Sequence, residues 1–338
     1  MIDPKIIASQ IDNCLVEAHF PELPNYYKGK VRENYDLPAE ASAKAGLPPI
    51  ATRILISTDR QSAFDVVLAA VPFKGQVLTQ VARFWFENTK DICANHVVEY
   101  PDPNVVVGRK LKMLPLEMVV RDYLTGSTDT SVYTAYSKGE REFCGNKLPE
   151  GLVKNQKLPE TILTPSTKPS DGSHDISVAP EYLIENNLVS KSQWEELADI
   201  SLRLFARGKE IAAKNGLILV DTKYEFGLDE NGIITLADEI HTPDSSRYWV
   251  AKSYEERMSG GAEPESLDKE FLRLWIRERC NPYEDKIPEI PRDVLVEFSG
   301  KYINLFETVT GKAFELPELG VSPKERIKQN LAKYFPQN

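Results

Sequence analysis

Cysteine is scarce in this sequence, and the few cysteines lie far apart. The 338 residues include four, Cys14, Cys93, Cys144 and Cys280, and no C-x-x-C pair occurs. Structural zinc sites and disulfide-rich secreted domains both depend on cysteines at characteristic close spacings. We therefore expect isolated thiols in a reducing compartment, with neither a zinc site nor a disulfide framework.

Long apolar runs are also missing. No stretch reaches the ~18 apolar residues that a membrane-spanning helix needs. The N-terminus, MIDPKIIASQIDNCLVEAHF, alternates charged and apolar residues and lacks the apolar core of a signal peptide. These two absences predict a cytoplasmic protein with no membrane partner.

Dense clusters of Lys and Arg are absent as well, and the formal net charge is −10. A nucleic-acid-binding face needs basic side chains that displace counterions, so nucleic acid is not an expected partner. Hydrophobic residues make up 41% of the chain and charged residues 27%, which is typical of a globular protein and not of a disordered one. The length exceeds that of most single cores, so we expect two lobes.

The pattern of expected elements favours an α+β fold. Residues 1–112 are mainly strand-like and form the first lobe, whereas residues 113–338 mix strands and helices. Because strands come first and mixed elements later, an alternating parallel α/β fold is disfavoured. Residues 137–180, rich in Lys, Pro, Gly and Ser, predict a long loop. Apolar periodicity predicts helices over 75–90, 190–215, 266–278 and 292–313.

The most informative stretch is LVDTKYEFGLDENGIITLADE, residues 219–239. An Asp-Glu-Asn-Gly turn joins two strand-like runs, and these carry Asp221, Lys223, Glu225 and Asp238 among apolar residues. A hairpin that looks buried thus contains three carboxylates and a lysine. Such groups are costly to bury unless they are paired or bind a ligand.

The register of this hairpin decides which side chains meet. A turn at 229–232 sets Glu225 opposite Leu236 and Lys223 opposite Asp238, and then the four charged residues share one face. Glu225 and Asp238 would lie close enough to bind one cation. The opposite face is expected to pack in the core and comprises Tyr224, Phe226, Leu228, Ile233 and Ala237. A slip of one residue would separate the carboxylates, and the alternative is a solvated face with one Lys–Asp pair.

Two carboxylates near a lysine are typical of a Mg²⁺–nucleotide site. Magnesium takes one or two protein carboxylates together with phosphate oxygens and water. A lysine balances charge on a transferring phosphoryl group. Neither a Walker A sequence nor G-x-G-x-x-G is present, so ATP would have to bind without those loops.

Several motifs resemble the phosphoribosylaminoimidazole-succinocarboxamide synthase family, the SAICAR synthetases of de novo purine synthesis. They span most of residues 25–280 in the family's order. The motifs are YYKGKVRENYDL, STDRQSAFDVVLAAVPFKGQVL, LPLEMVVRDYLTGS, KPSDGSHDISV, LVDTKYEFG, LADEIHTPDSSRYW and SLDKEFLR.

The resemblance implies an ATP-dependent ligase that joins carboxyaminoimidazole ribonucleotide (CAIR) to L-aspartate and releases ADP and phosphate. It implies a two-lobed architecture, similar to ATP-grasp and kinase-like proteins, with a β-rich ATP-binding lobe at 1–112 and an α+β lobe at 113–338. A CAIR acyl phosphate is the expected intermediate. ATP and Mg²⁺ are the expected cofactors. No carboxylase domain is appended, so we expect the monofunctional form, as a monomer.

The resemblance also implies roles for single residues. Glu225 and Asp238 match the family's metal carboxylates. The implied ATP contacts are Lys30, Arg32, Lys168, Glu225 and Asp238. The implied substrate contacts are Asp65, Arg121, Ser127, Lys223, Arg247 and Arg273. The implied catalytic residues are Asp221, Lys223 and Arg247.

One motif departs from the family's pattern, because KPSDGSHD is longer than the usual form between its lysine and its aspartate. His174 and Asp175 match the family's His-Asp pair, and we expect His174 to be structural.

Two other functions fit parts of the sequence. A small-molecule or inositol-phosphate kinase would use the same metal carboxylates but phosphorylate a hydroxyl group. The Arg121-TGS stretch together with Arg247 argues against it, because these residues imply an acceptor that carries both a phosphate and a carboxylate. A nucleotide-sensing protein with a degenerate site is the non-enzymatic alternative, and the presence of every charged motif residue argues against that one.

Overall fold

The computed structural model describes residues 2–128, 130–168 and 175–336. The chain forms two compact units, each assembled from separate stretches of sequence. Unit 1 comprises Met1–Phe84, His96–Lys110 and Trp275–Asn338, and unit 2 comprises Trp85–Asn95 and Leu111–Leu274. The expected boundary between the lobes, at 112/113, lies two residues after the boundary between the units at 110/111. Unit 1 also includes Trp275–Asn338, which we had expected in the second lobe. The assignment of ATP binding to the lobe at 1–112, and of metal, nucleotide and substrate residues to the lobe at 113–338, stays a prediction.

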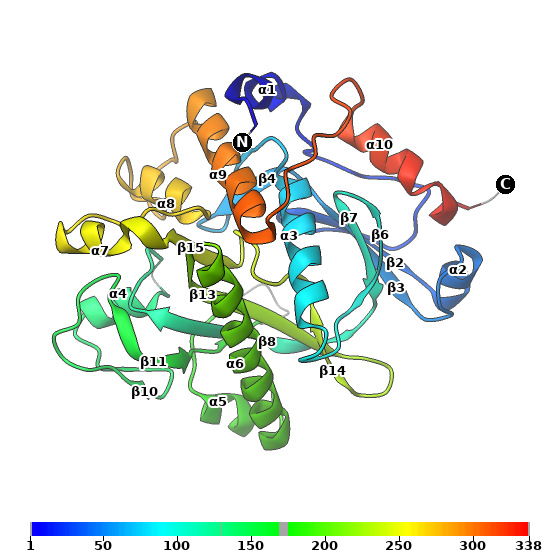
Figure 1. The fold of residues 1–338 in the computed structure, drawn as a ribbon. Helices are drawn as coiled ribbons and strands as arrows, with labels where there is room; N and C mark the ends of the chain where they lie inside the picture. Colours follow the sequence, from blue (N-terminus) through cyan, green and yellow to red (C-terminus); the bar gives the residue numbers. More distant parts are fainter. Residues whose placement is uncertain (1, 129, 169–174, 337–338) are drawn as a thin grey trace. The chain divides into compact units, whose positions relative to one another are not determined.

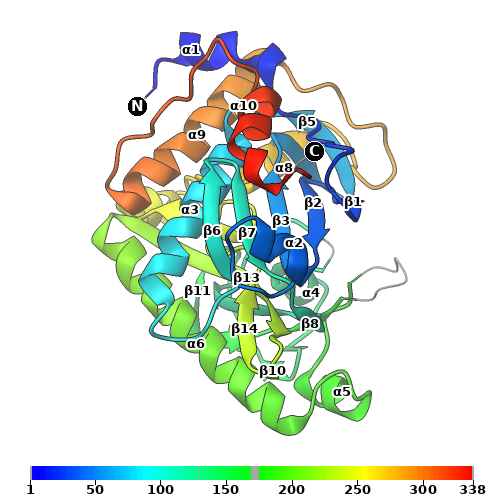
Figure 2. The ribbon, with the colours of Figure 1, turned by 90° about the vertical axis from the view of Figure 1, so that its right-hand side faces the viewer.

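Unit 1 contains a five-stranded antiparallel sheet in the order β1-β2-β3-β7-β6, whose strands Figure 2 shows in succession. The strands are β1 (Tyr26–Lys28), β2 (Arg32–Leu37), β3 (Thr52–Ser57), β6 (Val97–Asp102) and β7 (Val105–Arg109). Alternate apolar residues of these strands, such as Ile54 and Ile56 of β3, point into one core. That core also takes in Ile327, Leu331 and Tyr334 from the C-terminal segment.

A short hairpin in unit 1 was not expected from the sequence. It is formed by β4 (Arg60–Ala63) and β5 (Val66–Ala70), and its turn holds Phe64 and Asp65 at φ values of 51° and 62°. Such left-handed values are uncommon outside glycine. Unit 1 also contains α1 (Pro4–Ser9), η1 (Ile11–Asn13), α2 (Ala39–Lys44), residues 74–84 of α3 (Lys74–Thr89), α9 (Arg292–Thr310), α10 (Pro323–Asn330) and η2 (Ala332–Tyr334).

Unit 2 is built on a six-stranded sheet in which β13 is central. The order is β11-β8-β13-β14, with β12 paired to β8 and β15 paired to β13. Its strands are β8 (Lys112–Tyr123), β11 (Lys157–Leu163), β12 (Ser166–Thr167), β13 (Leu217–Leu228), β14 (Ile234–Ala237) and β15 (Ser246–Val250). A two-stranded ribbon, β9 (Glu142–Phe143) and β10 (Asn146–Lys147), accompanies it.

The long helix α6 (Lys191–Lys214) packs on β13 and β8 of this sheet (Figure 1). Its start is fixed by a capping box, since Ser190 Oγ accepts from Gln193 N and Gln193 Oε1 accepts from Ser190 N. Gly208 allows a close approach, because a Cβ there would lie 2.4 Å from His241 Cε1. Helices α4 (Val132–Ser137), α5 (Pro180–Glu185) and α7 (Ala251–Ser259) complete unit 2.

The helices expected from apolar periodicity are present. They correspond to α3 (Lys74–Thr89), α6, α9 and a shortened α8 (Glu270–Arg277). The expectation of a long loop over 137–180 is wrong, because β9, β10, β11 and β12 lie within it. These strands are short or polar, and they are held by pairing with each other and with β8, which periodicity does not reveal. The α+β class is confirmed, and in the described residues no helix is long and apolar enough to cross a membrane.

The expected register of the β13–β14 hairpin is wrong by one residue. Glu225 pairs with Ala237 and Leu228 pairs with Ile234, because a five-residue loop replaces the four-residue turn. Asp229 Oδ1 accepts from the backbone amide of Ile233 at 2.9 Å, which holds this loop closed. Ile233 is consequently 53% exposed and is not part of the core, whereas Ile234 and Leu236 move to the buried face.

Candidate active site

One face of the unit 2 sheet gathers the charged residues of β13 and its neighbours. Asp221, Lys223 and Glu225 are two apart, so they project from the same face. Across the ladder with β8, Arg121 lies opposite Asp221 and Glu117 lies opposite Glu225. The other face, where Tyr224 and Phe226 are fully buried, is apolar.

At one end of this face lie two glutamates and two lysines, which we call the acid–lysine cluster: Glu117, Lys168, Lys223 and Glu225. Lys223 Nζ lies 2.5 Å from Glu117 Oε1 and 3.4 Å from Glu225 Oε1. Lys168 follows β12, contacts Glu225 Oε2 and lies 3.8 Å from Glu117 Oε1. Both carboxylates are nearly buried, so each ammonium group partly neutralises an otherwise unfavourable pair of like charges.

The pKa shifts in the cluster follow from burial and charge. Burial alone would raise the pKa of Glu117, but the charges of Lys223 and Lys168 outweigh it and hold the pKa below its ordinary value. Burial raises the pKa of Glu225, and the charge of Asp238 adds to the effect. Burial opposes the charge on Lys223, yet Glu117 and Glu225 raise its pKa well above normal. Lys223 therefore remains an ammonium group and cannot serve as a general base at neutral pH.

The charge of Asp238 acts on this cluster although its strand is displaced by one residue. The register that pairs Glu225 with Ala237 would turn Asp238 away from the cluster. However, Asp238 follows the last residue of β14 and has a φ of 60°, so the backbone leaves the extended conformation there. The charge of Asp238 accordingly acts on both Glu225 and Lys223.

The carboxylates of this region suit a magnesium ion that is shared with a ligand. In the described residues, no three His, Cys, Asp or Glu side chains gather closely enough to hold a metal ion by themselves. The two ammonium groups around Glu225 show that its carboxylate attracts cations. Mg²⁺ takes hard oxygen donors and few protein carboxylates when phosphate oxygens complete its shell. Glu225 and Asp238 fit that donor set.

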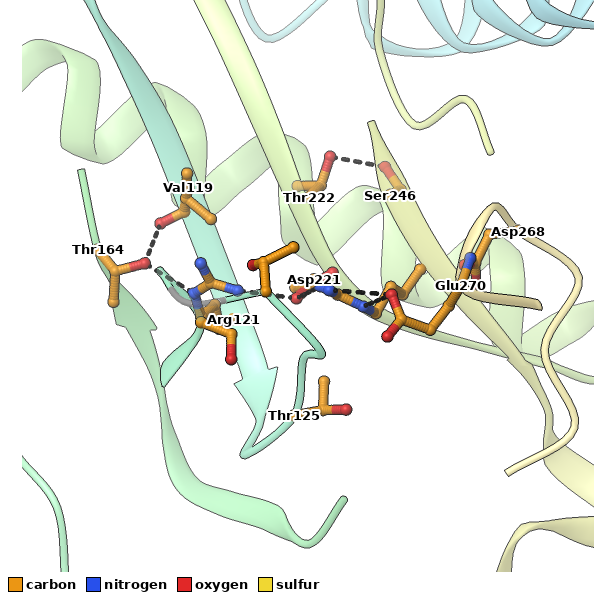
Figure 3. A network of polar contacts seen from close by, with 12 residues as sticks. Val119, Arg121, Thr125, Thr164, Asp221, Thr222, Ser246, Asp268 and Glu270 are labelled. Atoms are coloured by element: carbon orange, nitrogen blue, oxygen red, sulfur yellow. Dashed lines mark hydrogen bonds and ion pairs between the residues drawn. The ribbon is translucent and has the colours of Figure 1, made fainter. Parts of the chain in front are cut away.

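The other end of the face is an arginine cluster organised by two acidic residues: Arg121, Asp221, Arg247, Glu270 and Arg273. Asp221 Oδ2 accepts from Arg121 Nη1 at 3.0 Å and from Arg247 Nη1 at 2.6 Å. Figure 3 shows Asp221 between Arg121 and Glu270. Glu270 Oε2 lies 3.3 Å from nitrogens of both Arg247 and Arg273. Three guanidinium groups against two carboxylates leave a net positive charge, which suits a bound anion.

Arg121 is also held from the side away from Asp221. Its Nε donates to Thr164 Oγ1 at 2.9 Å, so both edges of the guanidinium group have fixed partners (Figure 3). Burial and the neighbouring charge of Arg247 lower the pKa of Arg121, whereas Asp221 opposes them. Burial opposes the charge on Arg247, yet Asp221 and Glu270 raise its pKa. Both groups remain charged, because arginine starts from a very high pKa.

The turn after β8 brings a hydroxyl group to the arginine cluster. Against burial, the charges of Arg247 and Arg273 lower the pKa of Glu270, and the buried Ser127 hydroxyl adds to this effect. Gly126 has a φ of 121°, and a Cβ there would lie 2.3 Å from Ser131 Cβ and 3.4 Å from Arg247 Nη2. Only glycine therefore lets this turn pass so close to Ser131 with a positive φ.

Three predicted site residues belong to unit 1. Lys30 Nζ donates to Asp65 Oδ1 at 2.6 Å, and both side chains are exposed. Arg32 begins β2 and lies opposite Ser57. The buried Arg60, which sequence reasoning missed, binds the backbone carbonyls of Gly29 and Lys30 at 2.9 Å each. Arg60 thus fixes the loop that presents Lys30.

A comparison with known protein families shows to which family the chain belongs. The model of the SAICAR synthetase family matches residues 25–290. The chain belongs to the SAICAR synthetase family. It is therefore an enzyme, an ATP-dependent carbon–nitrogen ligase of the kind that serves purine biosynthesis.

Relatives in the SAICAR synthetase family align with nearly the whole chain. A protein of Agrobacterium fabrum, provisionally named phosphoribosylaminoimidazole-succinocarboxamide synthase 2, is 56% identical over 95% of this chain and 98% of its own length. A SAICAR synthase from Saccharomyces cerevisiae, solved in complex with SAICAR, is 31% identical with a TM-score of 0.73, over 89% of this chain and all of that one. A SAICAR synthetase solved with ADP is 26% identical with a TM-score of 0.63, over 86% of this chain and all of that one.

Within unit 2 the SAICAR synthetase motifs meet in space, although they are far apart in sequence. The acid–lysine and arginine clusters join residues from five of the quoted motifs, including Lys168 of KPSDGSHDISV. Reasoning from sequence missed Glu117, Glu270 and Lys269. Lys269 has its pKa lowered to about 8 by burial and by Arg273. All three lie inside quoted motifs, but the sequence carries no signal for Glu117, because its place opposite Glu225 depends on the pairing of β8 with β13. His174 lies outside the described residues.

Proposed function

We propose that this protein joins CAIR to L-aspartate in an ATP-dependent reaction that yields SAICAR, ADP and phosphate. The observation that carries this proposal is the pair of charged clusters on one sheet face. The arginine cluster suits an anionic substrate, and the acid–lysine cluster suits a metal-bound polyphosphate. A ligase that activates a carboxylate with ATP needs both kinds of site side by side.

Each cluster has a proposed task. Arg121 and Ser127 hold the 5′-phosphate of CAIR, and Asp221 fixes the guanidinium groups of Arg121 and Arg247 for that purpose. Arg247 and Arg273 face the carboxylates of the substrates. Asp65 of unit 1 is proposed at the imidazole ring of CAIR.

Glu225 and Asp238 would hold Mg²⁺ with ATP. The chemistry that the ion supplies there is charge neutralisation on the transferring phosphoryl group. Lys223 and Lys168 add positive charge at the same place, and Lys30 and Arg32 of unit 1 are proposed contacts of the ATP phosphates.

The proposed chemistry proceeds in two balanced steps. A carboxylate oxygen of CAIR attacks the γ-phosphorus of ATP, and the bond to ADP breaks to leave an acyl phosphate. The neutral amine of L-aspartate then attacks the acyl carbon, phosphate leaves, and the amine loses a proton. Because Lys223 stays charged, its contribution is to stabilise negative charge on the phosphoryl oxygens, not to remove that proton.

An isotope experiment tests this proposal. CAIR labelled with ¹⁸O in its carboxylate is incubated with the protein, ATP, MgCl₂ and L-aspartate, and the released phosphate is analysed by mass spectrometry. We expect SAICAR and ADP in equal amounts, with one ¹⁸O in each phosphate. Unlabelled phosphate would contradict the acyl phosphate. ADP formation that does not depend on aspartate would contradict the ligase and favour a kinase.

A further inference from the structure

Glu117 is the member of the acid–lysine cluster that belongs neither to the proposed metal pair nor to the proposed nucleotide contacts. It lies on β8 directly opposite Glu225 of β13, and its side chain is nearly buried. Like charges placed opposite one another destabilise a sheet unless something compensates them. A second buried carboxylate at this place therefore calls for a physical explanation.

The contacts of Lys223 supply that explanation. Its ammonium group is 2.5 Å from Glu117 Oε1 but 3.4 Å from Glu225 Oε1, so Glu117 is its principal partner. The strands favour this choice, because Lys223 lies diagonally across the ladder from Glu117, within reach of a long side chain. On its own strand, Lys223 has Glu225 two residues away on the same face.

An ammonium group and a divalent cation compete for the same carboxylate oxygens. Lys168 already contacts Glu225 Oε2. Lys223 reaches Glu225 Oε1 only at 3.4 Å, and if it moved closer, a lysine would hold each oxygen of this carboxylate at short distance. The partner that draws Lys223 away is Glu117, and the lysine can keep that partner while a cation binds Glu225.

We propose that Glu117 is a positioning residue that holds the Lys223 ammonium and so leaves the Glu225 carboxylate available to a divalent cation. This inference rests on the proposed function, because it takes Glu225 as a cation ligand. It assigns to Glu117 control over cation affinity through Lys223, without contact between Glu117 and the cation.

The test measures binding of Mn²⁺ as MnCl₂, without nucleotide or substrate, from the electron paramagnetic resonance signal of the free ion. The proteins compared are the wild type, Glu117→Gln, Lys223→Met and the double variant. We expect Glu117→Gln to weaken Mn²⁺ binding about tenfold in the wild-type background, because Lys223 then turns to Glu225. With Lys223→Met present, the same change is expected to alter affinity less than about threefold.

Other outcomes overturn the proposal. If Glu117→Gln weakens Mn²⁺ binding equally in both backgrounds, Glu117 is itself a ligand. If it has no effect in either, Glu117 has no part in cation binding. Glu160→Gln, which removes a negative charge from an exposed position on β11, controls for general electrostatics and is expected to stay within about twofold of the wild type. Should Glu117→Gln fail to fold, Glu117→Asp allows the same comparison, because its shorter side chain draws the carboxylate away from Lys223.

Failure of this inference can be told apart from failure of the proposed function. Glu225→Gln is expected to weaken Mn²⁺ binding whatever Glu117 does. Unchanged affinity in Glu225→Gln would remove the proposed metal site itself. Weakened affinity in Glu225→Gln, with no coupling between Glu117 and Lys223, would overturn only the positioning role.

Discussion

At the scale of single residues, burial and neighbouring charges act in opposite directions on the pKa values of this site. Glu270 is buried, and burial by itself raises the pKa of a carboxyl group. Arg247 and Arg273 act in the opposite direction, and the pKa of Glu270 falls to about 2. An ionised Glu270 thus keeps two guanidinium groups in place, and this link between charge and position can be measured through stability.

Glu270→Gln is expected to destabilise the protein by about 3 kcal/mol at pH 7, because a pKa lowered from about 4.5 to about 2 corresponds to that free energy. A lowered pKa stabilises the folded state above the unfolded-state pKa, and this contribution is lost as pH falls toward the folded-state pKa. The difference between wild type and variant should therefore shrink below about pH 4 and be roughly halved near pH 3. Urea unfolding of both proteins across this range measures it.

A matched control is Asp199→Asn, since Asp199 forms an exposed i,i+4 pair with Arg203. Its effect on the free energy of unfolding should stay below about 0.5 kcal/mol at every pH. A difference between wild type and Glu270→Gln that is constant from pH 7 to pH 3 would contradict the role of the Glu270 charge.

At the scale of elements, the β13–β14 hairpin shows what sequence reasoning could and could not reach. Alternation along β13 correctly placed Asp221, Lys223 and Glu225 on one face, because strand geometry alone dictates it. The predicted register was wrong, because the length of the loop depends on hydrogen bonds that a sequence pattern does not display. Asp238 still acts on the cluster, but through a left-handed backbone at the strand end and not through strand pairing.

Contacts between distant parts of the chain also explain why Glu117 and the strands within 137–180 were not predicted. The partner strand of Glu225 is β8, about a hundred residues earlier in the chain, so Glu117 could be found only by knowing which strands pair. Within 137–180, β11 and β12 are likewise stabilised by pairing with β8, which lies earlier in the chain, whereas β9 and β10 pair with each other. Helices were easier to predict, because the start of α6 is decided by local side chains, Ser190 and Gln193.

The loop that sets the hairpin register can be tested directly. Asp229 Oδ1 accepts backbone hydrogen bonds from Asn231 and Ile233, both at 2.9 Å. Asp229→Ala leaves these amides without their acceptor and is expected to lower the free energy of unfolding by about 1–2 kcal/mol. Urea denaturation measures the change. Asp229→Asn should lose less, because an amide oxygen can accept the same bonds.

The neighbouring Glu230 is exposed, so Glu230→Ala serves as the control and should change stability by less than about 0.5 kcal/mol. Equal effects of Asp229→Ala and Glu230→Ala would show that the side chain of Asp229 does not hold the register.

At the scale of the whole molecule, the C-terminal segment is part of unit 1 although the family match ends at residue 290. Arg326 lies 3.0 Å from the buried carboxylate of Asp102 and 2.6 Å from Asn104 Oδ1. Asn330 Nδ2 donates to the same carboxylate at 2.7 Å. Beside these polar contacts, Leu331 enters the core of the five-stranded sheet and is fully buried. The segment therefore closes a core that the N-terminal strands alone leave open.

Leu331→Ala tests how much unit 1 depends on this closure. Truncating a fully buried leucine removes apolar contact and leaves a cavity, so we expect a loss of about 3 kcal/mol in the free energy of unfolding. Hydrogen exchange followed by mass spectrometry should show faster exchange in β2, β3 and β7, with smaller changes in β8 and β13 of unit 2. Leu319→Ala, at a position that is 37% exposed in the same segment, is the control and should change little. If exchange in β2 and β3 stayed as slow as in the wild type, the C-terminal segment would be an appendage, and the N-terminal residues of unit 1 would hold their fold without it.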